Sequence, residues 1–173
     1  MLNISRALLL IAAITMAGAA FAADEPATDR LAISGAVEHA LTFSADDLRQ
    51  LPLQEVNEVR ILNHKGDVVS ALKNVKGVRL RDILDKAVIK APEHNDVKKM
   101  VIIATASDDY KAVFSWNEIY NSPLGDGVLV IFEADGKALE DEGPLVTVST
   151  MDIRTGSRHV KWLTGIEVRK ITE

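Results

Sequence analysis

The chain has 173 residues, a formal net charge of −5 and no cysteine. The missing cysteines exclude thiol nucleophiles, thiolate metal ligands, iron–sulfur clusters and disulfides. The mild excess of acidic residues argues against a nucleic acid partner, because phosphate binding depends on clustered Lys and Arg. With 47% hydrophobic residues, one domain can be stabilised by burial alone.

The N-terminus has the features of a secretory signal peptide. Arg6 is the only charged residue in the first 23 positions, an apolar run follows it, and residues 20–22 form an A-x-A cleavage pattern. We expect residues 1–22 to be a signal peptide, residues 23–30 a loose leader, and residues 31–173 one domain located in the periplasm or secreted. Removal of Arg6 leaves 19 basic against 25 acidic residues, a net charge of −6. No later segment is apolar enough to span a membrane.

The first part of the domain is predicted to contain strands and two short helices. Ser44 and Asp47 have the spacing of a capping box, which starts a helix. Between Leu80 and Ala87 apolar residues recur at the i, i+3, i+4 and i+7 positions of one helix face. The strands expected here are residues 31–37, 41–43, 56–62 and 68–72.

The second part is richer in strands. Ser115 and Glu118 form another capping box, and the helix that it starts is expected to end near Tyr120. Residues 150–158 form a polar loop. The pattern indicates one α+β domain in which strands outnumber helices. The strands expected here are residues 100–105, 110–114, 128–133, 145–149 and 159–168.

Motifs of the common enzyme classes are absent. The four histidines are too far apart in sequence to form a zinc-type pair, and neither a G-x-S-x-G elbow nor a phosphate-binding glycine loop occurs. Hydrolase and zinc-enzyme functions are therefore disfavoured.

Polar residues gather instead in three loops at the ends of predicted strands, where binding pockets commonly form. Tyr110 offers an aromatic face, Asp108 or Asp109 can accept hydrogen bonds from an amino-heterocycle, and Arg154 can pair with an anionic or carbonyl group. The two aspartates can equally well shape a turn, and the tyrosine can equally well pack in the core. The loops are residues 63–65, 105–110 and 149–156.

Five segments of the chain form a pattern when taken together. Residues 75–84 read V-K-G-V-R-L-R-D-I-L, and residues 105–114 read T-A-S-D-D-Y-K-A-V-F. The other three are F-S-A-D-D-L with L-P, D-G-K-A-L with G-P-L, and V-K-W-L with I-E-V. In their order along the chain, which begins with F-S-A-D-D-L, they resemble the oxidoreductase molybdopterin-binding domain, the sulfite oxidase fold. The resemblance implies a strand-rich α+β domain like the molybdopterin-binding core of sulfite oxidase.

What the resemblance implies about function depends on one missing residue. Catalytic members of that family hold molybdenum through a cysteine thiolate after the strand that ends here near Leu62, where this chain has Asn63 and His64. The chain is more similar to small exported members that lack the cysteine, bind pterins without metal and signal to membrane proteins controlling cyclic-di-GMP. We therefore expect a non-catalytic protein that binds a pterin or molybdopterin-like ligand and no metal. Its expected protein partner is the periplasmic domain of a membrane signalling protein.

The same resemblance assigns a site and leaves two alternatives open. The first alternative is a molybdopterin-dependent oxidoreductase with an oxygen or nitrogen ligand in place of cysteine. The second is an interaction module with a closed, empty cleft. The residues that the resemblance assigns to the pterin site are Asn63, Ser107, Asp108, Tyr110 and Arg154.

Overall fold

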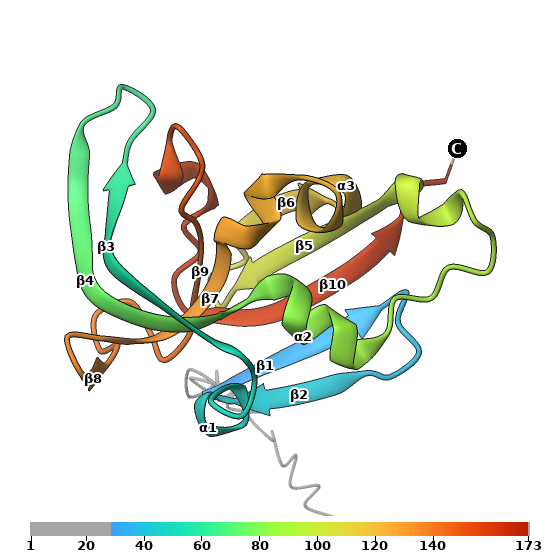
Figure 1. Cartoon of the computed structure of the whole chain (residues 1–173), viewed down its shortest axis with the longest axis horizontal. Helices are drawn as coiled ribbons and strands as arrows, with labels where there is room; N and C mark the ends of the chain where they lie inside the picture. The colour runs from blue at the N-terminus through green and yellow to red at the C-terminus, as the bar shows by residue number, and fades with distance from the viewer. Residues whose placement is uncertain (1–28, 173) are drawn as a thin grey trace, which may run out of the picture.

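The computed structural model describes residues 29–172, so the expected signal peptide and most of the leader lie outside the described residues. Two five-stranded sheets make up the domain (Figure 1). The first, in the order β2-β1-β10-β5-β6, contains β1 (Arg30–Gly35), β2 (Leu41–Ser44), β5 (Met100–Ala106), β6 (Lys111–Ser115) and β10 (Leu163–Lys170). The second, in the order β3-β4-β7-β8 with β9 also on β7, contains β3 (Leu53–Leu62), β4 (Val68–Arg79), β7 (Val128–Ala134), β8 (Lys137–Ala138) and β9 (Val146–Ser149).

The helices are short and lie between strands. The α-helices are α1 (Ala45–Leu48), α2 (Leu80–Ala87) and α3 (Trp116–Tyr120), and the 3₁₀ helices are η1 (Asp96–Lys99), η2 (Pro123–Gly127) and η3 (Thr155–Arg158). Both predicted capping boxes are confirmed: Ser44 and Ser115 each accept a hydrogen bond from the backbone three residues later, and the acidic side chain there bonds back. Within residues 29–172 no helix has the length and apolarity needed to cross a bilayer.

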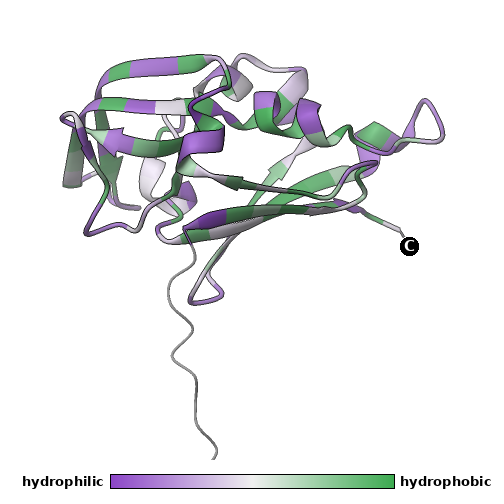
Figure 2. Cartoon of the chain, turned by 90° about the horizontal axis from the view of Figure 1, so that it is seen from below, coloured by the Kyte–Doolittle hydropathy of each residue, from purple (hydrophilic) through white to green (hydrophobic). Residues whose placement is uncertain are grey.

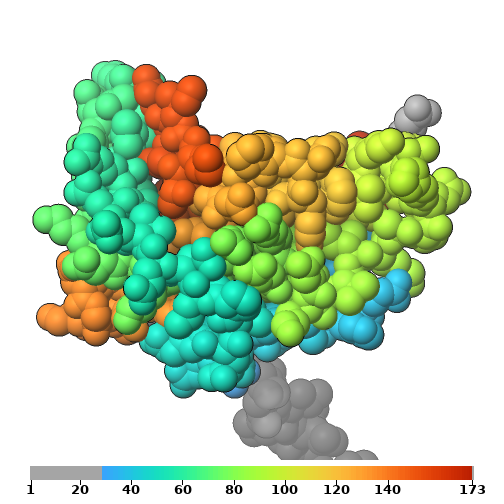
Figure 3. Space-filling view, in the orientation of Figure 1, coloured from blue at the N-terminus to red at the C-terminus, as the bar shows by residue number. Residues whose placement is uncertain are grey.

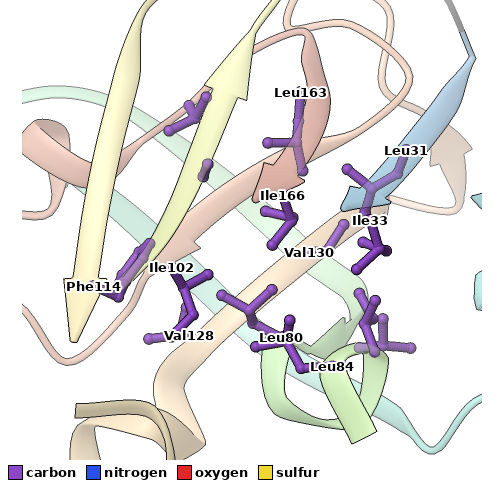
Figure 4. Packing of buried hydrophobic residues seen from close by; sticks show 14 of the residues in the cluster. Leu31, Ile33, Leu80, Leu84, Ile102, Phe114, Val128, Val130, Leu163 and Ile166 are labelled. Atoms are coloured by element: carbon purple, nitrogen blue, oxygen red, sulfur yellow. The ribbon is translucent and has the colours of Figure 1, made fainter. Parts of the chain in front are cut away.

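The predicted apolar face of α2 is buried in the main core. Leu80 and Leu84 are fully buried together with Ile83 and Ala87. Figure 4 shows Leu80 and Leu84 lying among strand residues that include Ile33 and Val130. The helical spacing of these apolar residues therefore determined which face of α2 is buried.

Strand β7 connects two hydrophobic cores, because both of its faces are buried. Val128 and Val130 belong to the main core. Leu129 and Ile131 belong to a second core, which is formed by side chains from the strands of the second sheet. Successive side chains of a strand point to opposite faces, so one apolar run supplies both clusters. In contrast, Figure 2 shows hydrophilic and hydrophobic residues alternating along the strands of the β3–β4 hairpin.

Several predicted strand boundaries differ from the structure, and those of β4 and β10 differ most. Strand β4 continues to Arg79 instead of ending at residue 72, because Gly77 pairs with Ile131 of β7 in a long-range ladder. Strand β10 begins at Leu163 instead of residue 159. The backbone of Trp162 has φ +49°, in the left-handed region, which interrupts an extended strand.

Candidate functional site

Two adjoining cavities lie where the loop after β9 meets both sheets. They share Gly156 and His159, and their volumes are about 550 and 360 Å³. We refer to them together as the cleft. The larger cavity is further lined by Ile61, Asn63, His64, Val69, Arg154 and Ser157. The smaller cavity is further lined by Ala106, Asp108, Tyr110, Lys161 and Trp162.

Four of the five predicted residues line the cleft. Asn63 and Arg154 line the larger cavity, and Asp108 and Tyr110 line the smaller one. Ser107 lines neither cavity; its backbone N–H donates to the carbonyl of Trp162 (3.0 Å) and so joins the β5–β6 turn to the cleft wall. A larger hollow of about 820 Å³ lies at the other end of the first sheet, but none of the predicted residues lines it.

Tyr110 and Asp108 combine a structural role with a position in the cavity. The Asp108 carboxylate accepts from the backbone N–H of Tyr110 (3.0 Å), which shapes the turn. Tyr110 is 45% exposed, so it is not a core residue. Its hydroxyl donates to the carbonyl of Ser157 (2.9 Å), which holds the ring against the loop after β9.

Asn63 and Arg154 are likewise held by local bonds. The Asn63 side-chain oxygen accepts from the backbone N–H groups of Lys65 (2.9 Å) and Asp67 (3.0 Å) and orders the turn of the β3–β4 hairpin. Arg154 donates from Nε to the His64 carbonyl (3.4 Å) and from Nη1 to the Ile153 carbonyl (3.1 Å). Arg154 therefore links the hairpin turn to the loop after β9 while it lines the cavity.

The cleft is bordered by a partly buried ionic cluster, which was not predicted from the sequence. Glu142 Oε2 lies 2.9 Å from His159 Nε2, and Glu142 Oε1 lies 2.9 Å from Lys161 Nζ. Burial by itself raises the pKa of the Glu142 carboxyl, but the hydrogen bonds from His159 and Lys161 outweigh it and hold the pKa below its ordinary value. The cluster thus fixes a carboxylate, an imidazole and an ammonium group at one wall of the cleft.

Comparisons with known proteins identify the family of the chain and a similar fold. A family model described as the oxidoreductase molybdopterin binding domain matches residues 18–173. The chain belongs to this family. The crystal structure of the sulfane dehydrogenase SoxCD from Paracoccus pantotrophus is similar in fold, with a TM-score of 0.55 and 21% identity over 83% of this chain and 39% of that chain. No curated protein matches the chain.

The residues of this molybdopterin-binding domain fit the organic part of the family's cofactor. Tyr110 and Trp162 supply aromatic faces in the smaller cavity, and Asp108 and Lys161 supply an acceptor and a donor. The residues do not supply comparable ligands for the metal of that cofactor. The chain has no cysteine, and within residues 29–172 no three His, Asp or Glu side chains are grouped to hold an ion. The cleft offers no thiolate to molybdenum.

Sequence reasoning missed His159, Lys161 and Trp162 for different reasons. His159 was considered as a metal ligand, and its partner Glu142 lies 17 positions away in the chain. Lys161 and Trp162 lie in the V-K-W-L motif that carried the family resemblance, so that motif was the available signal. Residues 159–162 were predicted to be part of a strand, so the sequence did not indicate that three of them line the cleft.

Proposed function

We propose that this protein binds a pterin in the cleft and does not catalyse oxygen-atom transfer. The observation that carries the proposal is a cleft of two adjoining cavities, about 550 and 360 Å³, in a molybdopterin-binding domain whose sequence contains no cysteine. An organic ring needs a shaped pocket with a few polar groups, whereas this family's redox chemistry needs a metal held by sulfur.

The smaller cavity suits the pterin ring system. Tyr110 and Trp162 are both partly exposed there, at 45% and 37%, so their rings are accessible to a planar ligand. The Asp108 carboxylate can accept hydrogen bonds from the amino and ring N–H groups of a pterin, and the Lys161 ammonium can donate to its carbonyl oxygen. The larger cavity, bordered by Arg154, leaves room for a substituent on the ring.

Titration with reduced and oxidised pterins tests the proposal. The fluorescence of the added pterin should change with a dissociation constant of about 1 μM or tighter. Tyr110→Ala should weaken binding by about 1–3 kcal/mol, because it removes an aromatic contact. Val113→Ala is the matched control, since Val113 is 52% exposed on β6, which follows Tyr110, and it lies outside the cavities. Flat titrations of the native protein with every pterin would refute pterin binding.

Metal analysis separates this proposal from a molybdopterin-dependent oxidoreductase with an oxygen or nitrogen ligand. The protein is isolated from cells that make the natural cofactor, and molybdenum is measured per chain by mass spectrometry. We expect a substoichiometric trace. One molybdenum per chain, together with turnover of an oxidisable substrate, would show that the protein is an enzyme.

Export and signalling complete the proposal. We infer from residues 1–22 that the protein is exported, and from the family resemblance that it presents the pterin to the periplasmic domain of a membrane signalling protein. N-terminal sequencing of the protein from a periplasmic fraction should begin at Ala23 or Asp24. Recovery of the chain only from the cytoplasm, with residues 1–22 intact, would overturn the export part.

A further inference from the structure

The loop of residues 150–158, which we call the bridge loop, is attached to both sheets. It leaves β9, contains η3 and supplies Arg154, Gly156 and Ser157 to the cleft. Figure 1 shows the loop beside the β3–β4 hairpin, and in Figure 3 its red surface lies between the hairpin and the orange surface around α3. Its position therefore sets the distance between the walls that enclose the ligand site.

One attachment is made by the side chain of Thr155 to the edge of the second sheet. The Thr155 hydroxyl accepts from the backbone N–H of Leu62 (2.8 Å) and donates to the carbonyl of Arg60 (2.6 Å). Among the strands of residues 29–172, β3 pairs only with β4, so within this part of the chain the two backbone groups have no strand partner on their outer side. Thr155 is 5% exposed, and its hydroxyl satisfies a donor and an acceptor of β3 at once.

Another attachment, in addition to the bonds of Arg154 and Ser157 described above, is made by Arg158 to the first sheet. Its guanidinium donates from Nε to Asp152 (2.6 Å), within the loop, and from Nη1 to Glu118 of α3 (2.9 Å). It also lies over the ring of Phe114 on β6, at 4.6 Å from the ring centroid. The bridge loop is thus held near its middle by β3, through Thr155, and at its C-terminal end by α3 and β6, through Arg158.

Gly156, in the wall shared by the two cavities, lies between Thr155 and Arg158, and His159 of the same wall directly follows Arg158. A Cβ atom built on Gly156 would lie 2.7 Å from the Leu62 carbonyl oxygen, so the loop backbone rests directly on the end of β3. We propose that Thr155 is a positioning residue: its hydroxyl holds Gly156 and His159 in place, so that the cleft is formed before the ligand enters. This inference rests on the proposed pterin binding, because preorganisation raises affinity by lowering the cost of ordering the site.

Two substitutions at one position test the inference. Thr155→Val keeps the branched shape and removes both hydrogen bonds, whereas Thr155→Ser keeps the hydroxyl. We expect Thr155→Val to weaken pterin binding about tenfold or more, mainly through faster dissociation, and Thr155→Ser to bind within about threefold of the native protein. A role in stability alone would lower the melting temperature of Thr155→Val and leave the affinity of the folded protein unchanged.

Hydrogen exchange of the Leu62 amide gives a readout without any ligand. In the free protein this amide should exchange about tenfold faster or more in Thr155→Val than in Thr155→Ser, because the hydroxyl is its acceptor. If the native protein binds no pterin, the proposed function fails while the exchange data still test the attachment of the loop. If Thr155→Val does not fold, Thr155→Ala, in which water can replace the hydroxyl, takes its place. Native affinity or native exchange in the folded hydroxyl-free variant would overturn the inference.

Discussion

Replacing Glu142 by Gln tests whether the ionic cluster at the cleft stabilises the fold. The side chain is 10% exposed and bonds to His159, which is 4% exposed, and to Lys161, which is 48% exposed. Glutamine keeps the shape but loses the charge. Because one of the two partners is half in water, we expect a loss of about 1–2 kcal/mol in the free energy of unfolding near pH 7. For a domain of this size the melting temperature would fall by about 3–6 °C.

The pH dependence makes this prediction specific. The pKa of Glu142 is lowered in the folded protein, so its carboxylate adds stability above the pKa of the unfolded chain, about 4.3. That contribution is lost as the pH falls through the lower, folded pKa. The difference between native protein and Glu142→Gln, measured by urea unfolding from about pH 7 to about pH 3.5, should therefore shrink. Asp141→Asn, at an exposed neighbour, is the control. A difference that stays constant with pH, or that is absent at pH 7, would refute the reasoning.

Three further substitutions test the packing and the local structure around the cleft. Leu84→Ala should lower the free energy of unfolding by about 2–5 kcal/mol, because it leaves a cavity at a fully buried position; urea unfolding with a loss below about 1 kcal/mol would contradict this. Ser115→Ala removes the cap of α3 and should cost about 0.5–2 kcal/mol, also by urea unfolding, and native stability would show that the cap contributes nothing. Gly156→Ala forces the bridge loop away from the Leu62 carbonyl, so limited proteolysis should cut the loop faster than in the native protein; an unchanged cutting rate would show that the contact can be relaxed.

The helices were predictable because their determinants are local. Each capping box joins residues three positions apart, and the structure confirms the boxes that begin at Ser44 and Ser115. The buried face of α2 followed from spacing alone. The strands were predictable in position, except for the two-residue β8, which was not predicted. Their lengths were less predictable, because the second half of β4 is held by its ladder to β7, which lies far along the chain.

The sequence indicated which loops form the site, but it did not indicate most of the contacts that their residues make. Asn63, Asp108, Tyr110 and Arg154 line the cleft, but each also makes bonds that the sequence did not indicate, such as that from Tyr110 to the Ser157 carbonyl. Whether each of them touches a ligand stays a prediction. Ser107 occupies the predicted turn and lies outside the cavity lining, and its backbone N–H donates to the carbonyl of Trp162.

The sequence by itself determined the family, through the order of its motifs, and the absence of any cysteine thiolate, because composition is independent of folding. Only the tertiary structure decided which polar groups face one another. The hydroxyl of Thr155 reaches Leu62 across 93 positions of sequence, and Glu142 reaches His159 across 17. Such contacts depend on how strands pair and how sheets pack, and no local pattern of residue types encodes that pairing.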